Sequence, residues 1–447
     1  MPSLLIINIR LLVNVREENQ LLKGKELSIL PCIENAYMVI EDGMIAGYGE
    51  MSKIQNSTLI PVSPQPARIT RSGKLRRTST QHKIDASNQY ILPCWCDSHT
   101  HLVFSDSREN EFVNKIKGMS YAEIAAKGGG ILNSSKQLNE TSEDELFNQA
   151  WKRLQEVSRL GTGAIEIKSG YGLSLEGELK MLRVIKKLKQ NSNLSIKSTF
   201  LGAHTYPSEY KTNHQGYIDI IINEMLPVIA KEKLADFIDV YCETGFFSPS
   251  ETETICNAGK SYGLKPKLHV NQLNSIGGIE VGLGLNSLSL DHLETLTEQD
   301  IQQLSLSSKE KTGVCTLLPT AAFFLGMPPQ PARKLIDAGC AVAIASDYNP
   351  GTSPSGNMNL VVAMSCIQMK MLPEEAINAA TINGAYAMDL QNDTGSITVG
   401  KKANLIFTKP IPSLAYLPYS FGTNLIDKVM INGDWVSRES GVVSRES

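Results

Sequence analysis

The segment Asp97-Ser98-His99-Thr100-His101 holds the residues whose types and spacing most clearly suggest chemistry. It follows an apolar run, Ile91–Cys96, which is typical of a β-strand. Because side chains on a strand alternate between its faces, the imidazoles of His99 and His101 should point the same way. Two neighbouring neutral imidazoles form half of a site for a divalent metal such as zinc or iron, although histidine pairs also occur in cores and on surfaces without a metal.

The elements that must position these histidines follow a repeating pattern from residue 91 onward. Short apolar runs occur at residues 91–96, 163–167, 196–202, 237–242, 266–270, 287–290, 312–318 and 341–345. Amphipathic segments lie between them at residues 143–159, 175–189, 216–233, 250–262, 276–285, 298–304 and 331–338. Strands that alternate with helices predict a parallel sheet, and eight such units predict a closed (β/α)8 barrel, or TIM barrel, of the α/β class.

The two ends of the chain share a different character. Strand-like runs flank the turn Glu41-Asp42-Gly43 near the start, and a second hairpin turn, Asn432-Gly433, lies near the end. We therefore expect residues 1–90 and 393–447 to form one small composite β-sandwich domain, into which the barrel of residues 91–392 is inserted. The tail repeats Val-Ser-Arg-Glu-Ser at 436–440 and 443–447, and the sequence suggests no role for this repeat.

Composition and charge exclude several classes of partner. The net charge of −3 gives no electrostatic basis for binding nucleic acid or an acidic membrane surface. The apolar run at residues 4–15 is too short to span a membrane and lacks the basic lead and cleavage site of a signal peptide. The eight cysteines are scattered along the sequence, which is typical of a protein whose thiols stay reduced. We expect a cytoplasmic protein that acts on a small molecule, with no nucleic acid or membrane partner.

Histidines gather at the predicted strand ends, where (β/α)8 barrels place their active sites. Five of the seven histidines lie there, namely His99, His101, His204, His269 and His292, and the eighth strand ends in Asp347. Scattered core histidines would not collect in this way, so the convergence favours a metal site. A site for one metal would take His99, His101, His269 and Asp347 and leave room for a water molecule, whose pKa the metal would bring near neutrality. Asp347 could accept the proton of that water.

Several motifs together resemble the imidazolonepropionase family of the amidohydrolase superfamily, whose members have a barrel inserted into a composite β domain. The resemblance covers roughly residues 90–405. The motifs are His99-Thr-His101-Leu-Val-Phe, Arg108-Glu-Asn-Glu-Phe, Gly128-Gly-Gly130-Ile, Glu166-Ile-Lys-Ser-Gly-Tyr171-Gly, Leu201-Gly-Ala-His204, His269-Val-Asn-Gln272-Leu, Asp291-His292-Leu-Glu and Ser346-Asp347-Tyr-Asn349-Pro-Gly351-Thr352. This resemblance implies hydrolysis of the cyclic amide of 4-imidazolone-5-propanoate to N-formimidoyl-L-glutamate, in histidine degradation.

The resemblance also implies contacts with the substrate. Arg108 matches an arginine that contacts the substrate in the family, and a guanidinium is the best planar partner for the propanoate carboxylate. Tyr171 and His204 match positions that contact the substrate too, and we expect them to help Arg108 hold the propanoate end. Positions that bind the ring or the product are matched by Asn349, Gly351 and Thr352.

Asp347 and His292 are expected to carry the catalysis. His292 could polarise the ring carbonyl and stabilise the oxyanion, and the alternative is a packed histidine that takes no part in the reaction. Asp347 would relay a proton to the leaving ring nitrogen. Gln272 stands where some relatives have a glutamate. Since glutamine cannot take up a proton at neutral pH, we expect Gln272 only to form a hydrogen bond with the substrate.

The end of the fourth strand bears on the number of metals. Many two-metal members of the superfamily carry a carboxylated lysine there, whereas this chain has Cys242-Glu243. We therefore expect one divalent metal per chain, and three histidines with one aspartate suit zinc and iron alike. The family also suggests a homodimer. Two alternatives remain open, namely another reaction of the superfamily, such as deamination of an aminated heterocycle, and a non-catalytic metal-binding scaffold.

Overall fold

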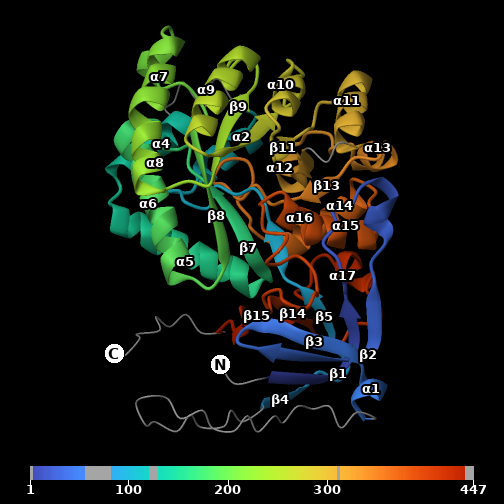
Figure 1. The fold of residues 1–447 in the computed structure, drawn as a ribbon. Helices are drawn as coiled ribbons and strands as arrows, with labels where there is room; N and C mark the ends of the chain where they lie inside the picture. Colours follow the sequence, from blue (N-terminus) through green and yellow to red (C-terminus); the bar gives the residue numbers. More distant parts are fainter. Residues whose placement is uncertain (1–3, 56–81, 120–128, 310–312, 438–447) are drawn as a thin grey trace.

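The computed structural model of the chain describes residues 4–55, 82–119, 129–309 and 313–437. Gly128, Thr312 and the tail repeat at 443–447 lie outside the described residues. The described part contains an eight-stranded parallel barrel surrounded by helices and a second eight-stranded sheet, which lies at the lower end of the molecule in Figure 1. The expected barrel and the expected small β domain are both confirmed.

The barrel strands run in sequence order around the sheet, and each pairs in parallel with the next. They are β6 (Trp95–Asp97), β7 (Thr162–Lys168), β8 (Ser195–Ala203), β9 (Phe237–Cys242), β10 (Lys265–Val270), β11 (Ser289–His292), β12 (Val314–Leu317) and β13 (Val342–Ile344). Backbone hydrogen bonds close the barrel just beyond the first and last strands. Asp347 N donates to His99 O at 3.0 Å, and His101 N donates to Tyr348 O at 2.9 Å. The first and last predicted site segments therefore meet at this seam.

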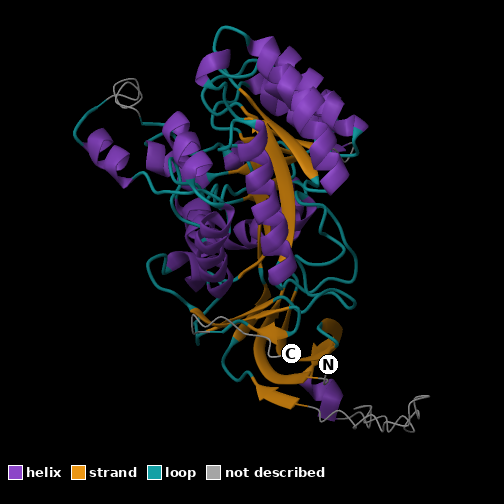
Figure 2. Ribbon diagram, turned by 90° about the vertical axis from the view of Figure 1, so that its left-hand side faces the viewer, coloured by secondary structure: helices purple, strands orange, loops and turns teal. Residues whose placement is uncertain are grey.

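Helices cover the outside of the barrel, and Figure 2 shows them around the strands. Several begin at a serine whose hydroxyl accepts an exposed backbone N–H of the first turn, as Ser142, Ser174 and Ser248 do. The helices are α2 (Glu109–Ile116), α4 (Ile131–Glu140), α5 (Glu143–Arg159), α6 (Leu175–Asn191), α7 (His214–Ile220), α8 (Leu226–Glu232), α9 (Pro249–Ser261), α10 (Gly278–Gly284), α11 (Glu298–Lys309), α12 (Pro319–Leu325), α13 (Ala332–Asp337), α14 (Met358–Ile367), α15 (Pro373–Ala380), α16 (Ile382–Tyr386) and α17 (Tyr416–Tyr419), with short turns at η1 (Gly24–Ser28) and η2 (Ser208–Tyr210).

Two predicted elements differ from the structure. The run 91–96, expected to be one strand, is divided between β5 (Tyr90–Pro93) of the small sheet and β6 of the barrel. Both pieces are buried, so an apolar pattern cannot reveal where the chain changes sheets. The predicted helix 216–233 contains a π-helical turn, η3 (Ile221–Met225), which ends two residues before Pro227. Pro227 has no N–H to donate to the preceding turn.

The small sheet is built from strands near both ends of the chain, and Figure 2 shows it below the barrel. Ile6, Ile9 and Leu12 of the first strand pack in one buried cluster with Phe407 and Met430. Both predicted hairpins are confirmed, because β2 pairs with β3 and β15 pairs with β16. The remaining bounds are β1 (Leu4–Val13), β2 (Cys32–Glu41), β3 (Met44–Glu50), β4 (His82–Asp85), β14 (Leu405–Thr408), β15 (Ile426–Ile431), β16 (Asp434–Trp435) and α1 (Met51–Gln55).

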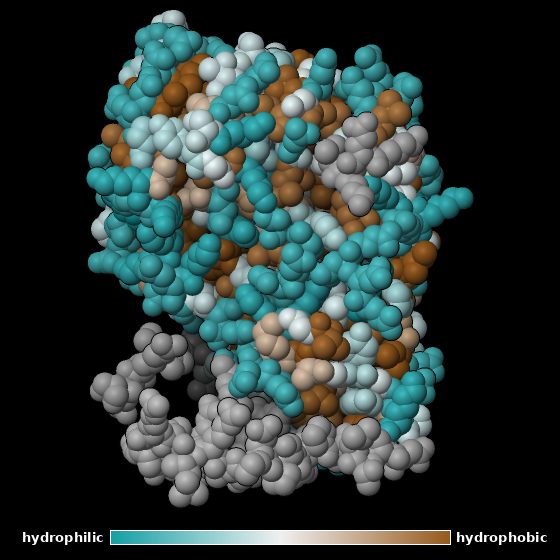
Figure 3. All heavy atoms as spheres, viewed as in Figure 1, coloured by the Kyte–Doolittle hydropathy of each residue, from teal (hydrophilic) through white to brown (hydrophobic). Residues whose placement is uncertain are grey.

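The visible outer surface is mostly hydrophilic, with hydrophobic side chains scattered among polar ones over the barrel helices (Figure 3). Among the described helices, none is long and apolar enough to cross a lipid bilayer.

Candidate active site

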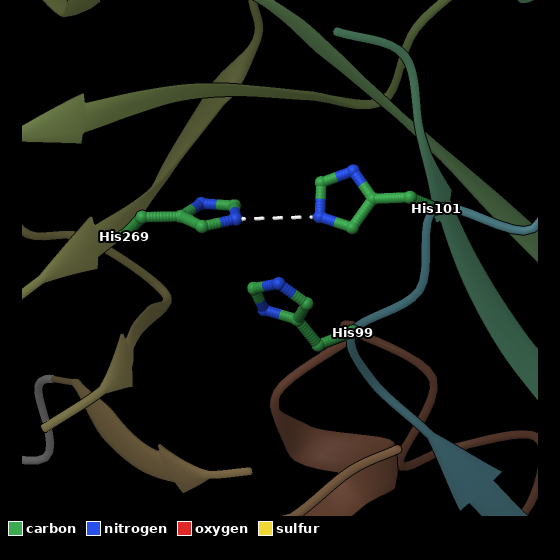
Figure 4. A group of neighbouring side chains, drawn as sticks. All are labelled: His99, His101 and His269. Carbon is green, nitrogen blue, oxygen red and sulfur yellow. Dashed lines mark hydrogen bonds between the residues drawn. The ribbon is translucent and has the colours of Figure 1, made fainter. Parts of the chain in front are cut away.

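Three imidazoles converge at the carboxyl end of the barrel. His99 and His101 follow β6, and His269 lies in β10 on the other side of the barrel. Their ligand nitrogens all lie within 4.8 Å of one another, and the Nε2 atoms of His101 and His269 are 3.4 Å apart. Figure 4 shows the three rings turned toward a common centre. Among the described residues, these three side chains form a buried group that could hold a metal ion.

Asp347 reaches the same centre from the segment that follows β13. Its Oδ1 atom lies 3.5 Å from His99 Nε2 and 3.6 Å from His101 Nε2. The backbone of Asp347 has a φ of 51°, a left-handed conformation that non-glycine residues adopt at some cost and that is common in functional sites. Burial raises the pKa of Asp347 to about 7, against the lowering effect of His292. A cation at the centre would favour its ionised form.

Two buried carboxylates orient the imidazoles. Asp291 Oδ2 accepts a hydrogen bond from His99 Nδ1 at 2.7 Å, and Asp239 Oδ2 accepts one from His269 Nδ1 at 2.9 Å. With Nδ1 protonated, each ring presents the lone pair of Nε2 to the centre. Sequence reasoning did not assign this role to either residue. One feature of the sequence could have indicated Asp239, because a carboxylate within an apolar run such as Phe237–Cys242 is unusual.

The residues present fit a divalent metal. Burial lowers the pKa values of His99, His101 and His269 well below the ordinary value, so all three rings are neutral, as metal ligands must be. Among the described residues, His99 Nε2 is buried without a hydrogen-bond partner, and such atoms are rare unless something else satisfies them. Three imidazole nitrogens and one carboxylate oxygen suit zinc or iron.

A layer of buried charge lies beneath this cluster. Lys168 Nζ contacts Glu166 Oε1 at 2.6 Å, Asp239 Oδ2 at 2.8 Å and Asp291 Oδ2 at 3.5 Å. Burial alone would lower the pKa of Lys168, but the three carboxylates outweigh it and raise the pKa. A second buried lysine, Lys267, contacts Glu166 Oε2 at 2.7 Å.

A cavity of about 570 Å³ opens above the cluster, a size typical of small-molecule sites. The structure brings together all seven predicted substrate-binding residues on its wall, which are Arg108, Tyr171, His204, Gln272, Asn349, Gly351 and Thr352. His101, His269, His292 and Asp347 line it as well. Sequence reasoning missed Lys115, Tyr241 and Phe246 on the same wall.

Arg108 lies at the start of α2 with its guanidinium held from one side. Its Nε and Nη2 atoms contact Glu111 Oε2 at 3.0 and 2.8 Å. The other carboxylate oxygen of Glu111 accepts a hydrogen bond from Gly130 N at 2.8 Å, which ties α2 to the start of α4. Arg108 Nη1 lies against Gly351. Lys115, seven residues further along α2, lies on the same face of the helix.

Tyr171 and His204 are neighbours in the wall, with ring centroids 5.6 Å apart. Glu178 holds the loop that carries Tyr171, because its carboxylate accepts hydrogen bonds from the backbone N–H groups of Gly170, Gly172 and Leu173 at 2.7 to 3.0 Å. Burial lowers the pKa of His204 to about 4, so the ring is neutral. Because its Nδ1 faces the Gly170 carbonyl at 3.0 Å, Nδ1 carries the proton and Nε2 is an acceptor.

Asn349 shapes the loop that follows Asp347. Its Nδ2 donates to Asp347 O at 2.7 Å and to Thr352 Oγ1 at 2.8 Å, and its Oδ1 accepts from the backbone N–H groups of Gly351 and Thr352, both at 2.8 Å. These four bonds use the full capacity of the amide. The side chain of Asn349 therefore builds this wall of the cavity.

His292 and Gln272 are each fixed by one neighbour. Glu294 Oε1 lies 3.3 Å from His292 Nδ1. Burial lowers the pKa of His292, but Glu294, Asp347 and Asp291 outweigh burial and raise the pKa overall. Tyr241 donates its hydroxyl to Gln272 Oε1 at 2.7 Å, which leaves the amide nitrogen of Gln272 as the group with donors to offer the cavity.

A closed barrel with a cluster of histidines and an aspartate at its carboxyl end is typical of metal-dependent hydrolases, and the sequence pattern of the Amidohydrolase family matches residues 229–436. The fold resembles that of E. coli guanine deaminase, with a TM-score of 0.67 at 14% identity over 98% of this chain and 100% of that one. An adenosine deaminase from Xanthomonas campestris with bound zinc gives a TM-score of 0.66 at 15% identity over 97% of this chain and 92% of that one. At these identities the likeness concerns the fold alone.

Sequence comparison narrows the family. The imidazolonepropionase of Flavobacterium johnsoniae is 55% identical over 96% of this chain and 98% of its own length, and that of Christiangramia forsetii is 53% identical over 96% and 99%. The imidazolonepropionase of Clostridium tetani is 40% identical over 93% of this chain and 94% of its own length. The chain belongs to the imidazolonepropionase family.

Proposed function

We propose that the chain hydrolyses the cyclic amide of 4-imidazolone-5-propanoate to N-formimidoyl-L-glutamate, a step of histidine degradation. As a member of its family it is a hydrolase that acts on C–N bonds. One observation in the structure carries the assignment of substrate. A guanidinium suited to a carboxylate and a metal-type histidine cluster line the same cavity, whose size suits a small ring.

We assign His99, His101, His269 and Asp347 as the ligands of one divalent metal per chain, either zinc or iron. Their convergence, the neutral rings and the unpartnered His99 Nε2 support this assignment. When bound, such a metal acts as a Lewis acid that polarises a carbonyl and makes a water molecule nucleophilic at neutral pH.

The wall of the cavity would orient the substrate by its two ends. Arg108, already held by Glu111 through Nε and Nη2, presents Nη1 to the propanoate carboxylate, beside Tyr171. His204 is expected from the sequence to help hold the propanoate, but its Nε2 is an acceptor, which suits an N–H group of the substrate and not a carboxylate. Gln272 offers its amide N–H to an acceptor on the ring. Gly351 and Thr352 contribute the loop surface against which the ring lies.

Asp347 and His292 would handle the charge and the proton. The two oxygens of Asp347 have separate surroundings, since Oδ1 faces the histidines and Oδ2 lies 3.4 Å from Thr352 Oγ1. We assign Oδ2 to take a proton from the attacking water and to pass it to the ring nitrogen as the C–N bond of the amide breaks. His292, with both ring nitrogens protonated, donates Nδ1–H toward Glu294 and presents its Nε2–H to the developing oxyanion.

Turnover with purified protein tests this assignment. 4-Imidazolone-5-propanoate, guanine and cytosine are offered separately, and the metal content of the same sample is measured. The proposal requires ring opening of the first compound only, with about one zinc or iron per chain. Ammonia release from guanine or cytosine would instead indicate a deaminase, and bound metal without hydrolysis of any cyclic amide would indicate a binding scaffold.

We further propose a cytoplasmic homodimer, with domain limits at residues 1–90, 91–392 and 393–447. The family resemblance supports the dimer. The two separate sheets support a division into a barrel and a small β domain, although β5 (Tyr90–Pro93) pairs within the small sheet, so the first limit falls after Pro93 and not at residue 90. Light scattering of the purified protein tests the dimer, which predicts a mass of twice 48.9 kDa.

A further inference from the structure

Lys168 lies beneath the histidine cluster and contacts two of the carboxylates there. Its side chain is fully buried, and its Nζ lies 2.8 Å from Asp239 Oδ2 and 3.5 Å from Asp291 Oδ2. These are the same two oxygens that accept hydrogen bonds from His269 Nδ1 and His99 Nδ1. One ammonium group therefore touches both carboxylates that orient metal-type histidines.

The barrel explains how one side chain can do this. Lys168, Asp239 and Asp291 lie on β7, β9 and β11, which are alternate strands. Inward side chains from alternate strands of such barrels meet in one layer across the interior. His99 and His269 come from opposite sides of the barrel, and this layer is the structure that links the groups behind them.

We propose that Lys168 is a positioning residue of the metal centre. It fixes the carboxylates of Asp291 and Asp239, and these carboxylates orient the rings of His99 and His269. This inference rests on the proposed metal site. Without the ammonium group, Asp239 and Asp291 would be two buried carboxylates with no shared cation. Apart from the bond to its histidine ring, each would keep a hydrogen bond only at its Oδ1 atom, from His269 N and from Ser289 Oγ respectively, so the Oδ2 atoms that orient the histidines would be less firmly held. Partners one step behind a ligand typically contribute about 10- to 100-fold to metal affinity.

Lys267 provides a matched control within the same layer. It is as fully buried as Lys168 and pairs with the other oxygen of Glu166, at 2.7 Å. Its remaining hydrogen bonds go to the backbone carbonyls of Ser98 and Ala387, and it forms neither a hydrogen bond nor an ion pair with Asp239 or Asp291. Loss of Lys267 therefore removes a buried ion pair without releasing the two carboxylates that hold the histidines.

The test measures metal binding by the full chain in the absence of substrate. Lys168→Met, Lys168→Arg and Lys267→Met are compared with the parent by competition with a zinc chelator and by the visible absorption of the cobalt-loaded protein, which reports ligand geometry. We expect Lys168→Met to weaken zinc binding about 10- to 100-fold and to alter the cobalt spectrum. Lys168→Arg should recover part of the affinity, and Lys267→Met should stay within about threefold of the parent.

A double variant that keeps the net charge of the buried layer shows whether the effect of Lys168→Met comes from misfolding. Glu166→Gln combined with Lys168→Met removes one charge of each sign and leaves Asp239 and Asp291 without the ammonium group, so the same loss of affinity is expected. Zinc affinity and a cobalt spectrum equal to the parent's in either Lys168→Met protein would overturn the inference, as would an equal loss in Lys267→Met. If the parent binds metal without turnover, the proposed function fails while this test still stands.

Discussion

Gly351 controls where the guanidinium of Arg108 can lie. A Cβ atom at residue 351 would stand 2.2 Å from Arg108 Nη1 and 3.1 Å from Cζ, whereas ordinary van der Waals contact begins near 3.4 Å. The guanidinium must therefore shift by about 1 Å if Gly351 is replaced by alanine. The backbone of Gly351 is not left-handed, so alanine itself fits the local conformation. The cost should consequently fall on substrate binding and not on folding.

The magnitude follows from the contact that is disturbed. A hydrogen bond to a charged group contributes about 1.5–3 kcal/mol, which corresponds to about 10- to 150-fold in affinity. Arg108→Ala should lower kcat/KM for 4-imidazolone-5-propanoate by about that factor, mainly through KM. Gly351→Ala, which displaces the guanidinium but keeps its charge, should lower kcat/KM by roughly 10-fold.

Steady-state kinetics of the two single variants and the double variant tests this reasoning. If Gly351 acts through Arg108, Gly351→Ala should have little further effect once Arg108 is alanine. Gly284→Ala is the control, because an added Cβ there meets nothing within 4 Å. Full additivity of the two changes, or an unchanged KM in Gly351→Ala, would refute the role given to this contact.

Three further predictions concern the same site. Asp347→Asn should lower kcat by about 100- to 10,000-fold, because the amide cannot accept the proton of water, and a kcat within threefold of the parent would exclude the proton relay. Lys115→Met should raise KM several-fold, because Lys115 adds positive charge to the wall that faces the carboxylate, whereas Lys115→Arg should keep the KM of the parent. An equal effect of Lys115→Met on an analogue that lacks the propanoate chain would show that charge is not the cause. Removal of metal with a chelator should abolish turnover and lower the melting temperature, and zinc or iron should restore both. A ligand present at 1,000 times its Kd stabilises a fold by about 4 kcal/mol, so an unchanged melting temperature would contradict the assigned metal site.

The barrel could be predicted from the sequence because its strands are short, buried and separated by amphipathic helices. The change of sheets at Cys94 could not, since Tyr90–Pro93 and Trp95–Asp97 are equally buried in different sheets. The hydrophobic pattern of a sequence indicates which residues are buried, but it does not indicate which strands pair with them. The backbone bond from Cys94 N to Asn404 O, across 310 positions of sequence, is visible only in three dimensions.

The predicted metal ligands and cavity residues meet in one place because strand ends bring them there. The groups behind them were missed for a physical reason. Asp239 and Asp291 act inside the barrel, where their contacts depend on which side chains face inward at one level. Lys168 stands within the motif Glu166-Ile-Lys-Ser-Gly, but its link to both carboxylates depends on the register of β7, β9 and β11. Asn349 lines the cavity as predicted, and the four hydrogen bonds that its amide forms within its own loop could not be predicted from the sequence.

The central claim is that this site opens a carboxylated cyclic amide by hydrolysis. The most direct measurement follows 4-imidazolone-5-propanoate with the metal-loaded protein in water enriched in oxygen-18, with the product analysed by mass spectrometry. The account predicts N-formimidoyl-L-glutamate that carries one oxygen-18 atom in the carboxylate formed from the ring carbonyl, and no free ammonia. Folded, metal-loaded protein that leaves the ring closed, or that releases ammonia from it, would contradict the account.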